Sequence, residues 1–289
     1  MLGTRRYGAA LPPMGVLLSG VLLSGVLAAA DARAAGVKVG YGISLAGLPI
    51  GEADLAAQVD GERYRTEVRV RFTGLAGAVT GGRAAATASG TVAGGRTVPG
   101  AFSISSASSS ASRTIRLGLE RGNVTAVEIN PPLENAGDRV PVTEAHRRGI
   151  VDPVSALVMP APARVDLTDP GLCERTLPVF DGGARFDVVL SYGGTRQASL
   201  GGYNGPVLVC NARYVPVAGH RPDRPGTRFM AENRDMNVWL APVPGERVLV
   251  PLRIQVATTT GTSVIEATRW APEGGSSGGQ ASRGGAPAR

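Results

Sequence analysis

The sequence predicts an all-β protein, mainly antiparallel, in which a curved sheet, half-barrel or barrel holds a short central helical insertion. Period-two alternation of apolar and polar residues recurs along most of the chain, as expected for strands with one buried face. Glycine-containing turn signals separate these runs at intervals of about ten residues, which favours antiparallel neighbours. Low charge (18%) with 41 glycines and 21 prolines fits a turn-rich sheet better than a helical bundle.

The first 34 residues have the three parts of a cleavable secretory signal. Arg5 and Arg6 precede an apolar run from Met14 to Ala30, and small residues at Ala32 and Ala34 follow it. The alternative, a membrane anchor, is disfavoured because serines and glycines interrupt a run barely long enough to span a bilayer. We expect cleavage after Ala34, a mature chain with no transmembrane segment, and a location in the periplasm.

The clearest strand runs from Tyr64 to Phe72. Its even-numbered side chains are apolar or small, whereas Arg65, Glu67 and Arg69 alternate with them and indicate a solvated face. The same pattern predicts further strands, in chain order, at 39–46, 52–59, 84–93, 98–105, 114–120, 124–130, 176–180, 186–192, 206–215, 236–241, 247–257 and 262–270.

Turn signals that contain glycine separate these runs. The expected turns are Asp60-Gly61, Gly94-Gly95, Arg121-Gly122-Asn123, Asp181-Gly182-Gly183, Gly193-Gly194 and Gly245. No glycine fingerprint of a nucleotide-binding loop lies between a strand and a helix, so the glycines indicate turns and no cofactor is expected.

Helix is expected only near the middle of the chain. Short helices are predicted at Thr143–Arg148 and at Asp152–Met159, where Asp152 can cap and Pro153 suits the first turn. We expect one antiparallel β domain over residues 35–271, interrupted by this insertion. The stretch 272–289 is rich in Gly, Ser, Ala and Pro and is expected to be a disordered tail.

The two cysteines, Cys173 and Cys210, would lie in an oxidising compartment after export. Metal binding would need further Cys or His ligands, and redox chemistry usually uses a C-x-x-C spacing. A structural disulfide between them is therefore favoured, and no metal site is expected.

Charge and composition disfavour a nucleic-acid partner. The net charge is +7, but the 30 basic residues include only one lysine and alternate with acids instead of forming a basic stripe.

Catalysis is also disfavoured by the residues available for it. His146 and His220 are the only histidines, and both lie in segments where a surface or turn role is the ordinary explanation. No G-x-S-x-G nucleophile elbow occurs between an expected strand and an expected helix. We therefore expect no catalytic residues.

Several short segments carry a family resemblance: Tyr41–Gly51, Val151–Val158, Tyr203–Pro206 leading to Cys210, and Asn237–Leu240 before Val250–Arg253. In order and spacing they resemble the exported bacterial proteins grouped as domain-of-unknown-function family 3108. The resemblance implies a curved antiparallel sheet related to the half-barrels of lipoprotein carriers and envelope sensors. The family has no agreed activity, so the resemblance implies no catalytic residues.

A concave sheet face is the remaining surface on which function can be expected. Aromatic residues are few, and Tyr41, Phe72, Trp239 and Trp270 are the candidates for lining a ligand groove, although core packing also explains such residues. We expect a non-catalytic exported envelope protein that binds or senses a lipid or other hydrophobic small molecule. The alternatives are an interaction protein that docks an envelope partner through its sheet and, third, an envelope hydrolase.

Overall fold

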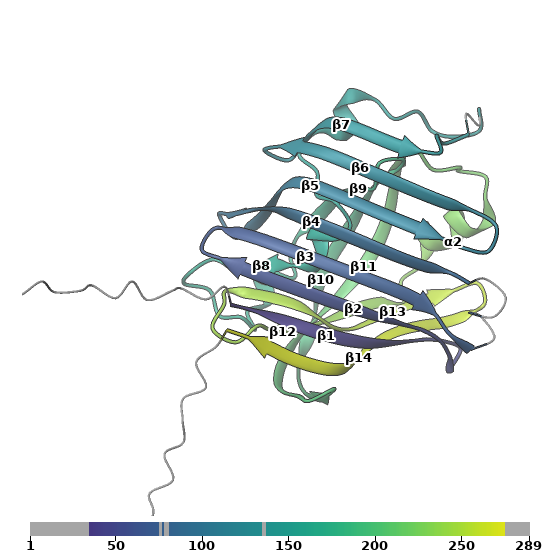
Figure 1. Cartoon of the computed structure of the whole chain (residues 1–289). Coiled ribbons are helices and arrows are strands. Elements are labelled where there is room, and N and C mark those ends of the chain that lie inside the picture. Colours follow the sequence, from purple (N-terminus) through teal and green to yellow (C-terminus); the bar gives the residue numbers. More distant parts are fainter. Residues whose placement is uncertain (1–34, 75–76, 78–80, 135–136, 275–289) are drawn as a thin grey trace, which may run out of the picture. The chain divides into compact units, whose positions relative to one another are not determined.

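The computed structural model describes residues 35–74, 77, 81–134 and 137–274 (Figure 1). The expected signal peptide, residues 1–34, lies outside the described residues. So do residues 275–289 of the expected tail. The last strand continues through Pro272 and Glu273, which pair with Val37 and Gly36, and so passes the expected domain end at 271.

One sheet holds all fourteen strands, and every ladder between them is antiparallel, which confirms the predicted fold class. The strand order is β7-β6-β5-β4-β3-β2-β1-β14-β13-β12-β11-β10-β9, and β8 pairs separately with β13. The strands are β1 (Ala35–Leu45), β2 (Leu48–Asp60), β3 (Arg63–Phe72), β4 (Arg83–Ala93), β5 (Arg96–Ala107), β6 (Ser112–Glu120), β7 (Asn123–Asn130), β8 (Met159–Pro160), β9 (Thr176–Phe180), β10 (Arg185–Leu200), β11 (Tyr203–Ala218), β12 (Met236–Pro242), β13 (Val248–Thr258) and β14 (Gly261–Glu273).

The period-two pattern sets the faces of the strands as expected. In β3, Tyr64 and Thr66 are buried, whereas Arg65 and Arg69 are exposed and flank Glu67. Exposed ion pairs of this kind contribute little to stability. Burial of the opposite, apolar face therefore contributes more to the stability of the sheet than these ion pairs do.

One expected turn is a β-bulge. At Gly193-Gly194 the register between β10 and β11 shifts, and β10 continues to Leu200. Gly194 has a φ of 126°, a conformation that side chains rarely tolerate. The glycine pair bends a long strand, and the hairpin turn follows at Gly201-Gly202.

The central insertion is helical in shorter pieces than expected. Two 3-10 turns, η1 (Glu144–Arg147) and η2 (Ser155–Leu157), lie within the two predicted helices, and a third, η3 (Pro170–Leu172), follows them. Met159 leaves the expected helix because β8 pairs it with Leu249 of β13. The described part of the chain also contains a short α-helix, α2 (Pro225–Glu232), in a segment expected to be loop.

The sheet is not closed, because its two end strands, β7 and β9, do not pair with each other. The insertion, which is the segment between β7 and β9 in the chain, forms hydrogen bonds at both ends. The N–H of Ile150 donates to Gly122 O in the β6–β7 turn at 2.8 Å, and the N–H of Val151 donates to Pro178 O of β9 at 2.8 Å. Phe180 of β9 returns a bond to Val151 O at 2.9 Å. Residues 150 and 151 thus connect two sheet edges that do not pair with each other.

Side chains of the insertion fill the space between strands β4 to β6 and strand β9. In Figure 1 the purple-to-teal strands lie in front of the green ones, and one buried cluster joins Phe102 of β5, Leu117 of β6 and Phe180 of β9. Ile150 and Val154 of the insertion belong to the same cluster.

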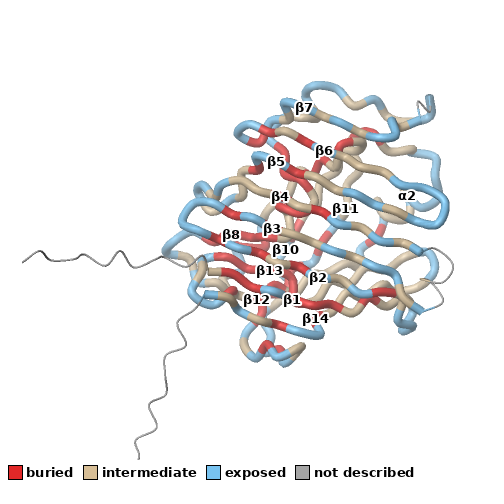
Figure 2. Tube along the Cα trace, viewed as in Figure 1, coloured by how far each residue is buried: buried red, intermediate tan, exposed pale blue. Residues whose placement is uncertain are grey.

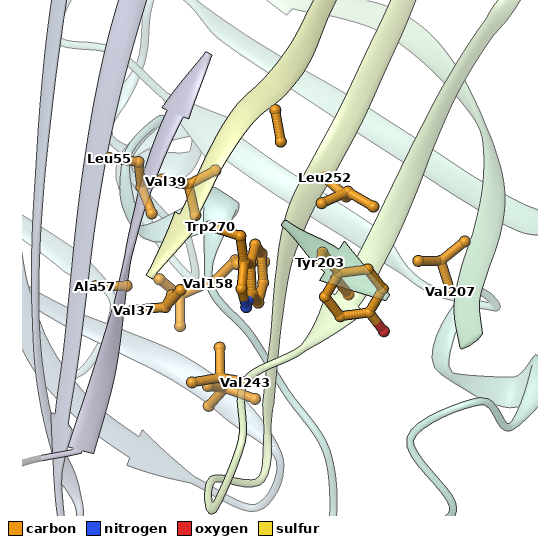
Figure 3. Close-up of a cluster of buried hydrophobic side chains, with 14 of the residues drawn as sticks. Val37, Val39, Leu55, Ala57, Val158, Tyr203, Val207, Val243, Leu252 and Trp270 are labelled. Atoms are coloured by element: carbon orange, nitrogen blue, oxygen red, sulfur yellow. The ribbon is translucent and has the colours of Figure 1, made fainter. Parts of the chain in front are cut away.

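A second cluster surrounds Trp270, with β1 and β2 on one side and Tyr203 on the other (Figure 3). Buried segments are concentrated along these middle strands (Figure 2).

The disulfide joins Cys173, directly after η3, to Cys210 of β11, with a Cα–Cα distance of 5.4 Å and a sequence separation of 37. Both cysteines are fully buried in a third apolar cluster with Leu172, Leu190 and Leu208. The bridge therefore fixes the end of the insertion to the inner face of β11.

Replacing both cysteines, Cys173→Ala with Cys210→Ala, should lower the free energy of unfolding by about 3–4 kcal/mol, because the unfolded chain regains the entropy of the closed loop. Urea unfolding of the oxidised protein and the double variant measures the difference. Reduction of the wild-type protein should produce a loss of similar size, and an unchanged urea midpoint in both cases would contradict the assignment.

Candidate functional site

An apolar cavity of about 280 Å³ lies between the insertion and the strands from β9 to β13. Its walls are Pro153, Ala156, Leu157, Met159, Leu177, Val179, Phe186, Val188, Leu190, Ala212, Met236, Asn237, Val238, Leu240, Pro251, Ile254, Gln255 and Val256. Asn237 and Gln255 are the only polar residues among them. Such a surface can hold an apolar group but offers few hydrogen bonds to a polar one.

The strand register explains why the cavity is apolar. Val188 of β10 lies opposite Leu177 of β9, and Val238 of β12 lies opposite Ile254 of β13, so these side chains share one face of the sheet. Leu157 belongs to the insertion that faces these strands. The cavity is thus the part of this face that the insertion covers without filling.

The four aromatic residues expected to line a groove are not on the walls of this cavity. Tyr41 is buried, and its hydroxyl donates to Pro251 O at 2.7 Å. Trp270 is also buried and contacts the ring of Tyr203 at a centroid distance of 5.1 Å (Figure 3). These two residues share one core cluster and hold the middle of the sheet together.

The other two expected residues lie elsewhere. Trp239 contacts the guanidinium groups of Arg196 and Arg253, which are 5.6 and 5.4 Å from its ring centroid. Phe72 ends β3 and is 41% exposed. Alternation placed Val188, Val238 and Ile254 on strands correctly, but nothing in their local sequence marks a cavity that forms only when distant strands meet.

A buried polar network fixes the insertion over the sheet. Asp152 is fully buried and accepts bonds from the N–H of Val154 at 3.0 Å and of Ser155 at 2.8 Å. Ser155 Oγ also donates to the second carboxylate oxygen of Asp152. Because that hydroxyl has one proton, Tyr64 of β3 must donate to Ser155 Oγ, at 2.6 Å.

This network has a structural role. Ser155 is fully buried and its hydroxyl is engaged by both neighbours, so it is not placed to attack a substrate. Burial raises the pKa of Asp152, and hydrogen bonds from Ser155 and Val154 partly oppose that effect. Burial also raises the pKa of Tyr64 well above its usual value, so the phenol stays a donor.

The two histidines have local roles. His146 Nδ1 accepts from the N–H of Thr143 at 3.1 Å and so caps η1. The main-chain oxygen of His220 accepts from the N–H of Val140 at 2.9 Å, which ties the insertion to the end of β11. Within the described ranges, no three Asp, Glu, His or Cys side chains are grouped as metal ligands would be.

Comparison with known proteins places the chain in a family. The family described as "Protein of unknown function (DUF3108)" matches residues 38–268, which include every strand from β2 to β13. The chain belongs to the DUF3108 family. This confirms the resemblance drawn from the short motifs. No curated protein matches this DUF3108 chain.

Among solved structures, the chain is similar to a crystal structure of a beta-barrel-like protein of domain of unknown function DUF1849 from Brucella abortus. The identity is 11% and the TM-score 0.45, and the match covers 83% of this chain and 99% of the other. In the described residues of this DUF3108 protein, none of the helices has the length and apolar character needed to cross a bilayer.

Ser155→Ala should lower the free energy of unfolding by about 2–4 kcal/mol, because it leaves Asp152 Oδ2 and the Tyr64 hydroxyl buried without a partner. Tyr64→Phe is the matched control, since it removes one donor but keeps the bond between Ser155 and Asp152, and it should cost about 1 kcal/mol. Urea unfolding compares the two. A Ser155→Ala variant that is no less stable than Tyr64→Phe would contradict this role.

The raised pKa of Asp152 predicts a pH dependence of stability. The unfolded chain ionises Asp152 near its ordinary pKa of about 3.9, before the folded protein does, so ionisation favours unfolding as the pH rises. The free energy of unfolding of the wild type minus that of Asp152→Asn should therefore fall as the pH increases above about 4, and level off above the folded pKa. Urea unfolding from acid to neutral pH measures this difference, and a constant or rising difference would be inconsistent with a raised pKa.

Proposed function

We propose that this DUF3108 protein is an exported, non-catalytic protein of the cell envelope that binds one hydrophobic chain in the apolar cavity. The observation that carries the proposal is the cavity itself, whose walls are apolar except for Asn237 and Gln255. An apolar group inside it would be removed from water, which is favourable in proportion to the area buried.

The size of the cavity limits the ligand. At about 280 Å³ it lies just below the range of about 300–1,000 Å³ that small-molecule sites occupy. A single alkyl chain or a small apolar ring system fits such a volume better than the two acyl chains of a phospholipid. We therefore propose a single-chain ligand.

The proposed location in the periplasm rests on two features. The first 34 residues have the charged, apolar and small-residue regions of a secretory signal. The disulfide between Cys173 and Cys210 is of the kind that persists in an oxidising compartment. Both features support export followed by oxidation.

A second candidate function is docking of an envelope protein through the sheet edge. Among the described strands the order ends at β7, so none of them pairs with the outer side of Asn123–Asn130. An extended segment of a partner can add to such an edge by main-chain hydrogen bonds. A substitution in β7 that prevents main-chain pairing at this edge should abolish docking of the partner protein. Binding of a hydrophobic ligand in the apolar cavity should be unaffected.

Filling the cavity tests the first proposal. Val188→Trp places a large ring where Val188 lines the wall and should abolish binding of the neutral fluorophore N-phenyl-1-naphthylamine. Val189→Trp is the matched control, because the adjacent side chain points to the opposite face and is not part of the wall. Fluorescence titration of both variants and the wild type measures binding.

The control should bind the fluorophore within about twofold of the wild type. Val238→Asn, which makes the same wall polar at similar volume, should weaken binding in the same direction as Val188→Trp. Equal binding by the wild type and by folded Val188→Trp protein would contradict a site in this cavity. Native mass spectrometry of periplasmic protein tests whether a natural ligand is carried.

A further inference from the structure

A second cavity, of about 240 Å³, contains three arginines and no acidic residue on its walls. Arg96 begins β5, Arg121 lies in the β6–β7 turn, and Arg175 directly precedes β9. The remaining walls are Ala93, Thr97, Val98, Gly122, Gly149, Ile150, Val151, Ala156, Val158, Met159, Pro160, Thr176, Leu177 and Pro178. Segments that are far apart in the sequence therefore bring three positive charges to one partly enclosed space, in which Arg175 is half-buried and Arg96 and Arg121 are exposed.

These three guanidinium groups have no carboxylate partner among the residues that the structure describes, in contrast to Arg116 with Glu128 or Arg253 with Glu266. Arg175 is half-buried, and burial together with the charge of Arg96 lowers its pKa. Gathering unpaired cations in a partly enclosed space is unfavourable unless an anion neutralises them.

The backbone conformation of Arg121 is a second unusual feature of this cavity. Arg121 is the first residue of a two-residue hairpin turn and has a φ of 52°, a conformation for which Asn, Asp or Gly is usual. The next residue, Gly122, is held in place because its carbonyl accepts the N–H of Ile150. The backbone of Arg121 is thus strained where this residue lines the cavity that Arg96 and Arg175 also line.

The arginine cavity adjoins the apolar one. Ala156, Met159 and Leu177 line both, so the two spaces adjoin at these residues. Methionine is unbranched and flexible and can change rotamer to join them. We propose that Arg96, Arg121 and Arg175 bind the phosphate or carboxylate head group of a single-chain amphiphile whose alkyl chain lies in the apolar cavity.

This inference rests on the proposed function and specifies its ligand class. Planar guanidinium groups can donate paired hydrogen bonds to the oxygens of phosphate and carboxylate, which makes arginine well suited to such a head group. A neutral alcohol of the same chain length would use the apolar cavity alone. Inorganic phosphate would use the arginine cavity alone.

Isothermal titration calorimetry with octyl phosphate, 1-octanol and inorganic phosphate tests the proposal on the mature full-length protein. The variants are Arg175→Gln and, as the matched control, Arg213→Gln, which replaces an exposed arginine of β11 on the wall of neither cavity. Thermal unfolding of each variant checks that it is folded.

We expect the wild type to bind octyl phosphate at least tenfold more tightly than either 1-octanol or inorganic phosphate. Arg175→Gln should remove most of the preference over 1-octanol, whereas Arg213→Gln should keep it. The melting temperature of ligand-free Arg175→Gln should equal or exceed that of the wild type, because an unpaired charge is lost.

Three results would overturn the inference, and they differ in what they imply for the proposed function. Equal affinity for octyl phosphate and 1-octanol would leave the apolar site standing and exclude the head-group site. Equal affinity for octyl phosphate and inorganic phosphate would leave an anion site without a chain. Binding of none of the three ligands would exclude both the inference and the proposed function.

Discussion

The buried carboxylate of Asp152, within the insertion, is the constraint on which the rest of the structure depends. It holds two backbone N–H groups and the Ser155 hydroxyl, and Ser155 in turn accepts a bond from Tyr64 of β3. A buried carboxylate without these donors would cost several kcal/mol, so the segment that supplies them has one stable conformation. These hydrogen bonds fix the position of Asp152 and Ser155 relative to β3.

From this fixed point the insertion reaches both ends of the sheet. Ile150 and Val151 bond to the β6–β7 turn and to β9, and Val154 packs between Phe102 and Phe180. An open sheet of fourteen strands would otherwise expose a large apolar face. The insertion covers that face and leaves two spaces beside Ala156 and Met159, one apolar and one lined by arginines. The proposed binding sites are therefore consequences of how the sheet is bridged.

Local sequence predicted the strands well because alternation reports burial directly. The run from Tyr64 to Phe72 is β3 with one residue added, and the pairing of Cys173 with Cys210 followed from the expected export and the cysteine count. The second central helix was too long in the prediction because Met159 is drawn into β8, although Asp152 accepts the N–H groups of Val154 and Ser155 as a helix cap does. Helix α2 was missed, although Pro225 at its first turn was an available signal.

The candidate sites could not be predicted in the same way. Arg96, Arg121 and Arg175 come from three turns or strand ends, and each looks like an ordinary surface residue in its own segment. Large aromatic residues were the natural choice for a ligand groove, yet Tyr41 and Trp270 are core residues because their rings fill the space between strands that pair only in the folded sheet. Such sites depend on long-range pairing, which periodicity does not reveal.

Native-state hydrogen exchange at Ile150, Val151 and Phe180 tests the central claim most directly. If the insertion bridges the two ends of the sheet as a structural element, these amides should exchange only through global unfolding, with the same free energy of opening as the paired residues Val39 and Leu55 in the middle of the sheet. Exchange of the three amides at a much lower free energy, while Val39 and Leu55 remain protected, would show that the insertion opens independently and would contradict this account.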